Sequence, residues 1–298
     1  MCPVESALKP YVARLAESMR LLPDKPDETA QATARALWHL AAGARLSLHG
    51  AWEKALPQLD AQGCQRLAAL IEERVRGVPL AHLTGMQRFM GLDLLAGKEA
   101  LIPRKETELL GQAALDHLRE LAVTRQELLV IDVCTGSGNL AVAMAHYVAR
   151  ARVFASDLSH DAAMLAVRNA HHVRVHDRVE VREGDLLAPF DEPRFHGAAD
   201  LLLCNPPYIS SAKVDAMPEE ISKHEPRLAF DGGPFGVNLV IRLMRDGLRF
   251  LRTGGVLAFE VGLGQAPGLA RRLATAGYGE VRSLADSAGE IRALIATR

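Results

Sequence analysis

The tetrapeptide Asn205-Pro206-Pro207-Tyr208 is the first place where residue types and spacing suggest chemistry. It follows the apolar run 201–204, which is typical of a buried strand. Neither proline has an N–H, so the pair cannot extend a strand ladder and holds the chain stiff and extended instead. The side-chain oxygen of Asn205 and the carbonyl oxygen of Pro206 would then be two fixed hydrogen-bond acceptors, with Tyr208 able to lie against a flat substrate.

Such a pair of acceptors suits a planar NH2 group, as in a carboxamide, an aniline or adenine. A methyl group on a sulfonium reaches a nitrogen by direct displacement, so positioning can supply much of the acceleration. Accepting the protons of the NH2 group also raises the electron density on nitrogen as the new bond forms. We therefore expect Asn205, Pro206 and Tyr208 to be catalytic, and all four residues of the tetrapeptide to contact the acceptor. In isolation, a proline-rich loop that merely ends a strand would look similar.

A second motif lies upstream, between a predicted strand and a predicted helix. Its residues are Asp132, Cys134, Thr135, Gly136, Ser137 and Gly138. Glycines allow a tight turn and leave room for a ligand against bare backbone, at the carboxyl end of a strand where ligands bind. Residues 136–141 also fit the dinucleotide fingerprint G-x-G-x-x-G/A. The loop alone therefore does not separate a nicotinamide cofactor from S-adenosylmethionine.

Two features favour S-adenosylmethionine as the ligand of this loop. Asp132 precedes the glycines and could accept hydrogen bonds from the loop or from the amino-acid part of the ligand. The end of the chain, at 277–284 and 291–296, reads as two strands joined by a turn. Such an antiparallel end suits a methyltransferase sheet better than a sheet of six parallel strands.

Two acidic residues follow the next predicted strands. Asp157, with Leu158 after it, comes about 20 residues beyond the loop, where an acid typically receives ribose hydroxyls. Asp185 follows the third strand, and its carboxylate could meet the exocyclic amine of adenine while Leu186 packs on the ring. A solvated turn acid is the alternative for Asp185, because acids in loops are usually exposed.

The first part of the chain predicts helices. Helical spacing is found over 7–22, in a second segment that runs through Ala34, Leu37 and Leu40 to Gly43, and over 56–75, which could hold one helix or two. Asp27 or Thr29 could cap the second of these helices, and Asp60 the third. Alternation around Gly91, over 87–94, then predicts a short hairpin.

From residue 128 onward, strands and helices alternate. Strands are predicted over 128–133, 152–155, 179–182, 199–204 and 255–261, and helices over 106–121, 140–148, 161–171 and 239–251. Solid apolar strands that alternate with helices imply a parallel sheet covered on both faces. The predicted fold class is α/β. Its predicted parts are a helical domain at 1–84, a β-hairpin linker at 85–104 and a catalytic domain at 105–298.

The composition, net charge and cysteine count argue against several other classes of protein. The chain has 298 residues, 49% hydrophobic and 24% charged, with a net charge of −1, so no global charge favours nucleic-acid binding. Its four cysteines lie far apart, which argues against a zinc site and against a disulfide framework. The histidines 171, 172 and 176 have no nearby cysteine to complete a metal site, so we expect no metal. We also expect no membrane segment and no signal peptide, hence a cytoplasmic protein.

The motifs taken together resemble those of the HemK/PrmC-type protein (glutamine-N5) methyltransferases, a family of class I S-adenosylmethionine-dependent enzymes. Besides the glycine loop and the tetrapeptide, the similar stretches are 79–85, 89–92, 101–108 and 225–233. The resemblance implies an N-terminal helical bundle, a hairpin linker and a Rossmann-like catalytic domain. It also implies an acceptor glutamine in the Gly-Gly-Gln motif of a release factor.

The same resemblance implies roles for individual residues. Residues 134–138 would wrap the methionine part of the cofactor, while Asp157 would hold its ribose. Asp185 and Leu186 would border its adenine, and Asn205 with Pro206 would hold the reacting nitrogen; these assignments repeat those made from the strand ends. Pro103 and Arg104 would lie near the mouth of the site.

Some residues depart from the family pattern. Cys134 stands where release-factor enzymes usually have Gly, and a similar Cys is found in the related ribosomal-protein glutamine methyltransferases. Lys105 replaces the usual Pro. The first domain, expected to help recognise the substrate, resembles the family only loosely, at 36–40. The expected acceptor is therefore a protein glutamine, in a release factor or a ribosomal protein, and the alternative is a small molecule methylated on nitrogen or oxygen by the same scaffold.

Overall fold

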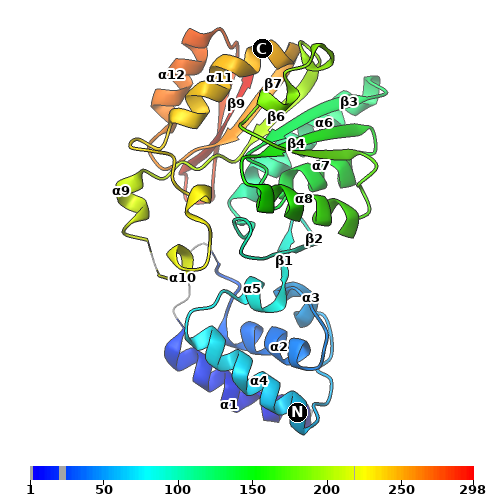
Figure 1. Ribbon diagram of the computed structural model, residues 1–298, viewed down its shortest axis with the longest axis vertical. Helices are drawn as coiled ribbons and strands as arrows, with labels where there is room; N and C mark the ends of the chain where they lie inside the picture. Colours follow the sequence, from blue (N-terminus) through cyan, green and yellow to red (C-terminus); the bar gives the residue numbers. More distant parts are fainter. Residues whose placement is uncertain (1–2, 20–24, 218) are drawn as a thin grey trace.

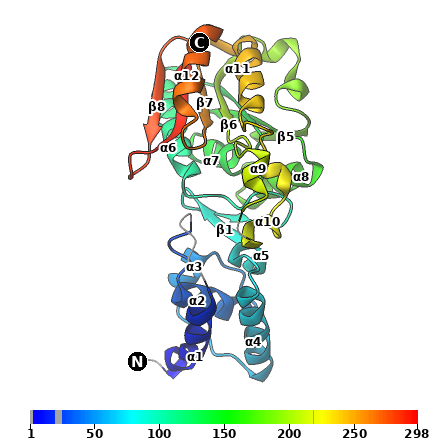
Figure 2. The ribbon, with the colours of Figure 1, turned by 90° about the vertical axis from the view of Figure 1, so that its left-hand side faces the viewer.

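The protein has two lobes joined by a short hairpin (Figures 1 and 2). The computed structural model describes residues 3–19, 25–217 and 219–298. The lower lobe contains α1 (Pro3–Ser18), α2 (Ala30–Ala41), α3 (Leu48–Trp52), α4 (Ala61–Val75) and α5 (Leu80–Thr84). Its fully buried residues include Leu15, Leu37, Leu67 and Ala34. The helix predicted over 7–22 ends at Ser18, and residues 20–24 lie outside the described part of the chain.

Side-chain caps begin two of these helices where the sequence predicts them. The hydroxyl of Thr29 accepts a hydrogen bond from the backbone N–H of Ala32 at 3.2 Å. The carboxylate of Asp60 accepts one from Gly63 at 2.6 Å. Each cap satisfies a backbone donor that the first turn of a helix leaves without a partner.

The predicted hairpin consists of β1 (Met86–Phe89) and β2 (Leu92–Leu95), which pair antiparallel. Met90 and Gly91 form its turn with φ of 47° and 81°. Left-handed residues at both turn positions match the twist of the two strands. The division of the chain into parts at residues 84 and 104 stays a prediction.

The upper lobe is built on a seven-stranded sheet. Its strands are β3 (Leu128–Val133), β4 (Ala151–Asp157), β5 (Val179–Glu183), β6 (Ala199–Cys204), β7 (Leu251–Glu260), β8 (Val281–Ala285) and β9 (Ile291–Thr297). They lie in the order β5-β4-β3-β6-β7-β9-β8. Only β9 runs antiparallel to its neighbours β7 and β8; the other pairs are parallel. The predicted α/β class and the predicted antiparallel end are both confirmed.

Helices cover both faces of this sheet (Figure 1). On one face, α6 (Thr107–Thr124), α7 (Asn139–Tyr147) and α8 (His160–His172) pack against side chains such as Val130. On the other, α11 (Asn238–Phe250) and α12 (Ala266–Ala276) pack against side chains such as Ile131. The connections contain the short helices α9 (Ser211–Val214), α10 (Glu219–Ser222), η1 (Ala188–Phe190), η2 (Pro193–Phe195) and η3 (Arg227–Ala229). No helix in the described ranges is both long and apolar enough to cross a membrane.

Two predicted strand starts are wrong. The strand predicted from residue 255 begins at Leu251. The sequence predicts a strand from Gly277, but Gly277 has φ of 101° and ends α12 as a left-handed cap. The strand β8 begins only at Val281. Helix α12 itself was not predicted; its Pro267 lies in the first turn, where the missing proline N–H costs no hydrogen bond.

A buried ion cluster joins the two lobes. The guanidinium of Arg74, at the end of α4, lies 3.5 Å from Glu28 and 3.2 Å from Glu220 of α10. The ammonium of Lys25 lies 3.7 Å from Glu220. The side chain of Arg74 is only 3% exposed. Because it lies between two carboxylates, its removal would leave both without their shared partner.

We expect Arg74→Met to destabilise the helical lobe by roughly 3 to 5 kcal/mol, the usual effect of removing one member of a buried ion pair. The two tryptophans of the chain, Trp38 and Trp52, both lie in this lobe, so urea unfolding followed by tryptophan fluorescence reports on it. Arg76→Met, on the exposed side of the same helix end, is the matched control and should change stability by less than about 0.5 kcal/mol. Equal effects of the two substitutions would contradict the importance of the cluster.

Candidate active site

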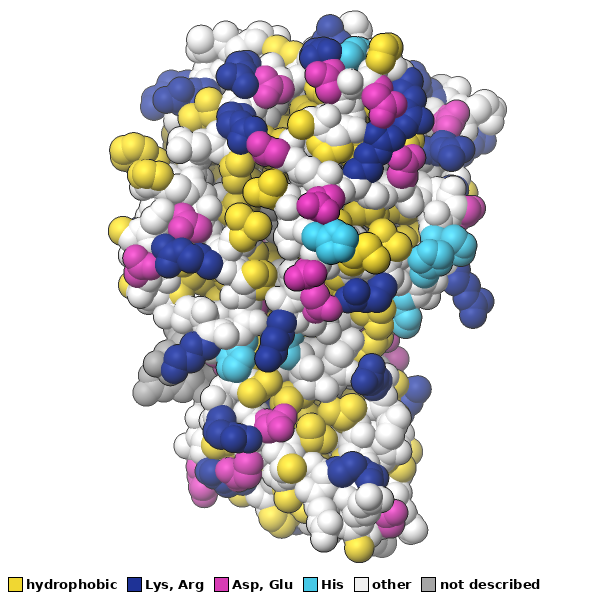
Figure 3. Space-filling model, in the orientation of Figure 1, with side chains coloured by type: hydrophobic (Ala, Val, Ile, Leu, Met, Phe, Trp, Pro, Cys, Tyr) yellow, Lys and Arg dark blue, Asp and Glu magenta, His cyan; other side chains and the backbone are white. Residues whose placement is uncertain are grey.

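The carboxyl edge of the sheet brings the two sequence motifs together. Strands β3 and β6 pair in parallel, with Val133 opposite Cys204. The next residues, Cys134 and Asn205, therefore leave the sheet side by side, and both line one cavity. Figure 3 shows hydrophobic side chains gathered along a furrow on this face of the upper lobe. The predicted site residues that line the cavity are Arg104, Cys134, Thr135, Gly136, Ser137, Asp157, Leu158, Asp185, Leu186, Asn205 and Pro207.

Left-handed backbone shapes the glycine loop. Cys134, Gly136 and Gly138 have φ of 55°, 55° and 77°. At Gly138 a Cβ atom would lie 2.8 Å from the Cβ of Ala166 on α8, so both the conformation and the space require glycine. The loop can pass this close to α8 only because Gly138 has no side chain.

The hairpin and α8 hold the loop from behind through Asn169, which is fully buried. Its amide nitrogen donates to the carbonyl oxygens of Ser137 at 2.9 Å and Leu95 at 3.1 Å. Its oxygen accepts the N–H of Leu95 at 2.7 Å. One side chain thus ties the linker hairpin to the loop.

Asp132 lies beneath the loop with one oxygen unused. Its Oδ2 accepts a hydrogen bond from the Thr135 hydroxyl at 2.6 Å. Its Oδ1 is buried and has no hydrogen-bond partner among the described residues, and the same holds for the hydroxyl of Ser137. Burial raises the pKa of Asp132 to about 7. A buried carboxylate oxygen without a partner is costly unless a ligand supplies a donor.

Asp157 organises the backbone around the cavity. Its Oδ2 accepts the N–H of Gly136 at 2.8 Å, and its Oδ1 accepts that of Ser159 at 2.9 Å. Each carboxylate oxygen can accept a second hydrogen bond, so both still have capacity for hydroxyl groups of a ligand. Burial raises the pKa of Asp157.

Asp185 and Leu186 lie at the same cavity but in different surroundings. Asp185 is 42% exposed and pairs with Arg242 at 2.6 Å. Leu186 is buried with φ of 48°, and its carbonyl oxygen accepts the Ser156 hydroxyl at 2.7 Å. Leu158 is 57% exposed at the rim. The predicted adenine-side residues are brought together, although Asp185 already has an ionic partner.

Asn205 separates this cavity from a second one. The second cavity is lined by Leu101, Arg104, Glu106, Asn205, Pro206, Tyr208, Ile209, Met217, Ile221, Ala229, Phe230, Glu260 and Arg292. It shares Leu101, Arg104, Asn205 and Ala229 with the first cavity. The amide nitrogen of Asn205 donates to the Thr107 hydroxyl at 3.0 Å, which leaves its oxygen available. A group bound in the second cavity would therefore meet Asn205 at the junction.

The other predicted residues divide between the two cavities. Tyr208 lines the second, where its hydroxyl donates to Glu260 at 2.9 Å; Pro207 lines the first. Arg104 lines both, and its guanidinium donates to the buried Glu225 at 2.6 Å. Asp132 and Gly138 line neither and support the loop from behind.

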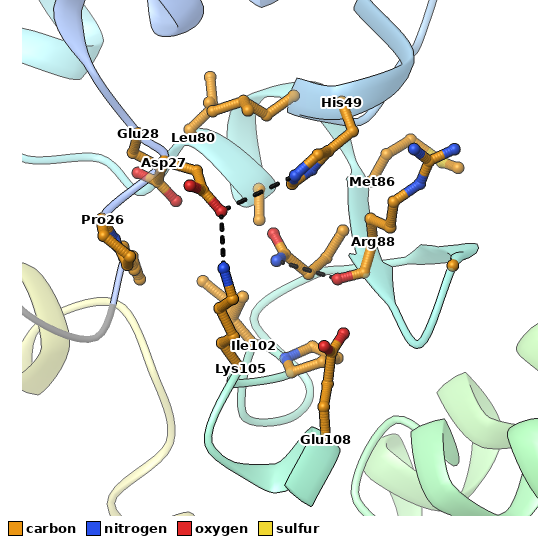
Figure 4. Close-up of a pocket in the computed structure, with 16 residues that line it drawn as sticks. Pro26, Asp27, Glu28, His49, Leu80, Met86, Arg88, Ile102, Lys105 and Glu108 are labelled. Carbon is orange, nitrogen blue, oxygen red and sulfur yellow. Dashed lines mark hydrogen bonds and ion pairs between the residues drawn. The ribbon is translucent and has the colours of Figure 1, made fainter. Parts of the chain in front are cut away.

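A separate groove lies where the helical lobe meets the hairpin (Figure 4). There the carboxylate of Asp27 lies between the ammonium of Lys105, at 3.3 Å, and the imidazole of His49, at 3.8 Å. Its lining mixes both signs of charge and includes no residue of the glycine loop or of the tetrapeptide. Only Pro103 lines both this groove and the first cavity. The groove is a joint between the lobes and not the reaction site.

Comparison with known proteins identifies the family of this site. The Methyltransferase small domain family matches residues 110–237. A release factor glutamine methyltransferase from Moorella thermoacetica is 39% identical over 231 residues, which cover 76% of this chain and 78% of that protein. Another, from Gloeobacter violaceus, is 37% identical over 233 residues and covers 78% and 79%. The chain belongs to the release factor glutamine methyltransferase family.

Two further similarities extend this result. A ribosomal protein uL3 glutamine methyltransferase from Xylella fastidiosa is 39% identical over 195 residues, which cover 65% of this chain and 60% of that protein. The hMettl16 catalytic domain, solved in complex with MAT2A 3′UTR hairpin 6, superposes with a TM-score of 0.53 at 17% identity, covering 76% and 81%. The second likeness shows the fold alone, which is the Rossmann-like methyltransferase sheet that the sequence predicts.

The enzyme accordingly uses S-adenosylmethionine as its methyl donor. The first cavity fits this cofactor on its own chemistry. Asp157, which lines the cavity, has unused acceptor capacity for ribose hydroxyls. Asp132 lies beneath the loop and does not line the cavity, but its buried carboxylate favours an ammonium group on the other side of the loop. The roles of the individual residues stay predictions.

Among the site residues that were not predicted, three support predicted ones. Thr107, Glu225 and Glu260 each hold a predicted residue in place through a side-chain hydrogen bond. Thr107 and Glu225 lie inside stretches that resemble the family, at 101–108 and 225–233. Glu260 ends an apolar strand at the carboxyl edge, as Asp157 does, so the same rule could have found it.

We expect the affinity for S-adenosylmethionine to rise as the pH increases through about 7, because ionised Asp132, from beneath the loop, attracts the cofactor's ammonium group. Asp132→Asn should bind more weakly and lose this pH dependence. In the cofactor-free protein the sign is opposite: burial of the charge lowers stability as the pH rises from about 4 to about 7. Titration calorimetry between pH 6 and 8 measures the affinities, and a flat wild-type profile would contradict the assignment.

Gly138→Ala should weaken cofactor binding and destabilise the protein, because the added Cβ meets Ala166 at 2.8 Å. Gly289→Ala is the matched control: Gly289 also has positive φ, 84°, but nothing lies within 4 Å of its Cβ position. The control should cost only about 1 to 2 kcal/mol of left-handed strain. Calorimetry and thermal unfolding measure both effects, and equal losses in the two variants would rule out the contact.

Proposed function

We propose that this enzyme transfers a methyl group from S-adenosylmethionine to the side-chain amide nitrogen of a glutamine in a protein. The orientation of Asn205 carries this proposal. Its amide nitrogen is committed to Thr107 at 3.0 Å, so its oxygen is the group available where the two cavities meet. An available oxygen accepts N–H groups, and a glutamine carboxamide has two to donate.

The tetrapeptide then acts by positioning. The Asn205 oxygen and the Pro206 carbonyl oxygen would each accept one N–H of the amide, which fixes its plane. A methyl group can then approach the nitrogen only from a face of that plane, and the reaction gains from the held geometry. The acceptors also stabilise the positive charge that develops on nitrogen as the bond forms. No base is needed before attack, because the proton leaves after methylation.

A release factor is the first candidate for the protein acceptor. Its support is the similarity to release factor glutamine methyltransferases over 76% and 78% of this chain. Ribosomal protein uL3 is the second candidate, supported by the shorter match to a uL3 enzyme. Both acceptors belong to the translation machinery, so we place the activity in the cytoplasm. We assign recognition of the acceptor protein to the helical domain at 1–84.

The decisive assay incubates the enzyme with methyl-labelled S-adenosylmethionine and, separately, a release factor, uL3 and a metabolite extract. We expect label on one protein glutamine, located by peptide mass spectrometry. Label only in metabolites would overturn the proposal in favour of a small-molecule acceptor.

Asn205→Ala should lower kcat by roughly 10²-fold or more, as expected when one polar contact to the transition state is removed. The affinity for S-adenosylmethionine, measured by calorimetry, should stay within about threefold, because the cofactor would be held mainly by the glycine loop and Asp157. A parallel loss of cofactor affinity would mean that Asn205 serves the cofactor and not the acceptor.

A further inference from the structure

A hydrogen-bonded relay lies behind Asn205, and no step described above requires it. Glu260, the last residue of β7, is 4% exposed, and Thr107, the first residue of α6, is 1% exposed. The Thr107 hydroxyl donates to Oε2 of Glu260 at 2.7 Å. The Tyr208 hydroxyl donates to Oε1 at 2.9 Å, and the Asn205 amide nitrogen donates to Thr107 at 3.0 Å.

The direction of this relay follows from what each group can do. An ionised carboxylate only accepts hydrogen bonds, and a hydroxyl has a single hydrogen to donate. Thr107 gives its hydrogen to Glu260, so only its lone pairs face Asn205. The two orientations of a carboxamide have nearly the same shape, so the chemistry of the partner decides between them. Thr107 therefore selects the orientation that directs nitrogen inward and oxygen toward the acceptor cavity.

The negative charge on Glu260 determines the orientation of the Asn205 amide. Burial raises the pKa of Glu260, while hydrogen bonds from Thr107 and Tyr208 oppose the shift; Glu106 and Arg292 are the charged groups that face it. Burial also raises the pKa of Tyr208, so its hydroxyl keeps its proton and donates. A protonated Glu260 would gain a donor and could reverse the bond to Thr107. The Thr107 hydrogen would then be free to meet the Asn205 oxygen.

We propose that Glu260, acting through Thr107, is a positioning residue that fixes the orientation of the Asn205 carboxamide and thereby makes the acceptor site select an NH2 group. This inference rests on the proposed function for the identity of the acceptor. With the amide reversed, the site would present N–H groups to the substrate. It would then repel a glutamine nitrogen and favour an oxygen, so the relay determines specificity as well as rate.

Substitutions at Thr107 test the relay while keeping the packing similar. Thr107→Val has nearly the same shape but no hydroxyl, and Thr107→Ser keeps the hydroxyl but loses a methyl group. We expect Thr107→Val to lower kcat at least about tenfold at saturating cofactor, with unchanged cofactor affinity. Thr107→Ser should stay within about threefold of wild type. Equal losses in the two variants, or wild-type kcat in Thr107→Val, would overturn the proposal.

Glu260→Gln tests the charge. Its amide can either accept from Thr107 or donate to it, so the orientation of Asn205 is no longer unique. Wild-type kcat should fall at acid pH as Glu260 gains a proton, and the variant should lose this fall. Glu290→Gln, an exposed position in the β8–β9 turn, is the matched control and should keep the wild-type profile. An unchanged acid fall in Glu260→Gln would overturn the assignment to Glu260.

An NMR measurement, which needs no enzyme turnover, tests this inference separately from the proposed function. The side-chain NH2 signals of Asn205, assigned in ¹⁵N NMR spectra by their loss in Asn205→Ala, should show one slowly exchanging set in wild type and in Thr107→Ser. They should lose that protection in Thr107→Val and split or shift in Glu260→Gln. Identical Asn205 signals in all variants would overturn the relay. A wild-type enzyme that labels no protein glutamine but shows these spectral changes would overturn the proposed function alone.

Discussion

The parallel pairing of β3 with β6 is the constraint on which the site depends. It aligns Val133 with Cys204, so the glycine loop and the Asn205 tetrapeptide leave the sheet at the same point. The main-chain hydrogen bonds between these strands are buried, so a shift of register would be costly. The distance between a methyl donor and an acceptor nitrogen is thus set by the sheet and not by flexible loops, which suits a reaction that depends on positioning.

At this edge, the polar atoms that lack partners mark where ligands belong. Most buried polar groups of the site are paired inside the protein, as Asp157 is with Gly136 and Ser159. The exceptions are informative: Oδ1 of Asp132 and the hydroxyl of Ser137 are buried without a partner among the described residues. At the junction of the cavities, the bond from the Asn205 amide nitrogen to Thr107 leaves the Asn205 oxygen available. Since a buried polar group without a partner costs free energy, the two buried atoms at the glycine loop point to a ligand that completes their hydrogen bonds.

The helices, strands and turns that depend on local sequence pattern could be predicted, whereas contacts between side chains far apart in the sequence could not. Solid apolar strands, capped helices and the Met90-Gly91 turn are local, and the order of elements followed from them. The bond between Thr107 and Glu260 joins residues 153 positions apart, so no spacing rule reveals it. The salt bridge between Arg104 and Glu225 spans 121 positions. Neither the hydrogen-bond partner of Tyr208 nor the direction of the Asn205 amide could therefore be predicted.

The residues that hold the reacting amide are separate from the contacts between the acceptor cavity and the helical lobe. The relay through Thr107 and Glu260 lies wholly within the upper lobe. The segment that closes the cavity also carries Glu220, whose ionic partner Arg74 belongs to the helical lobe. Substitutions in the helical lobe can therefore alter the segment beside the acceptor cavity while the Asn205 amide stays held by the same atoms. That separation accords with the match to the Methyltransferase small domain family, which covers residues 110–237 and so lies within the upper lobe.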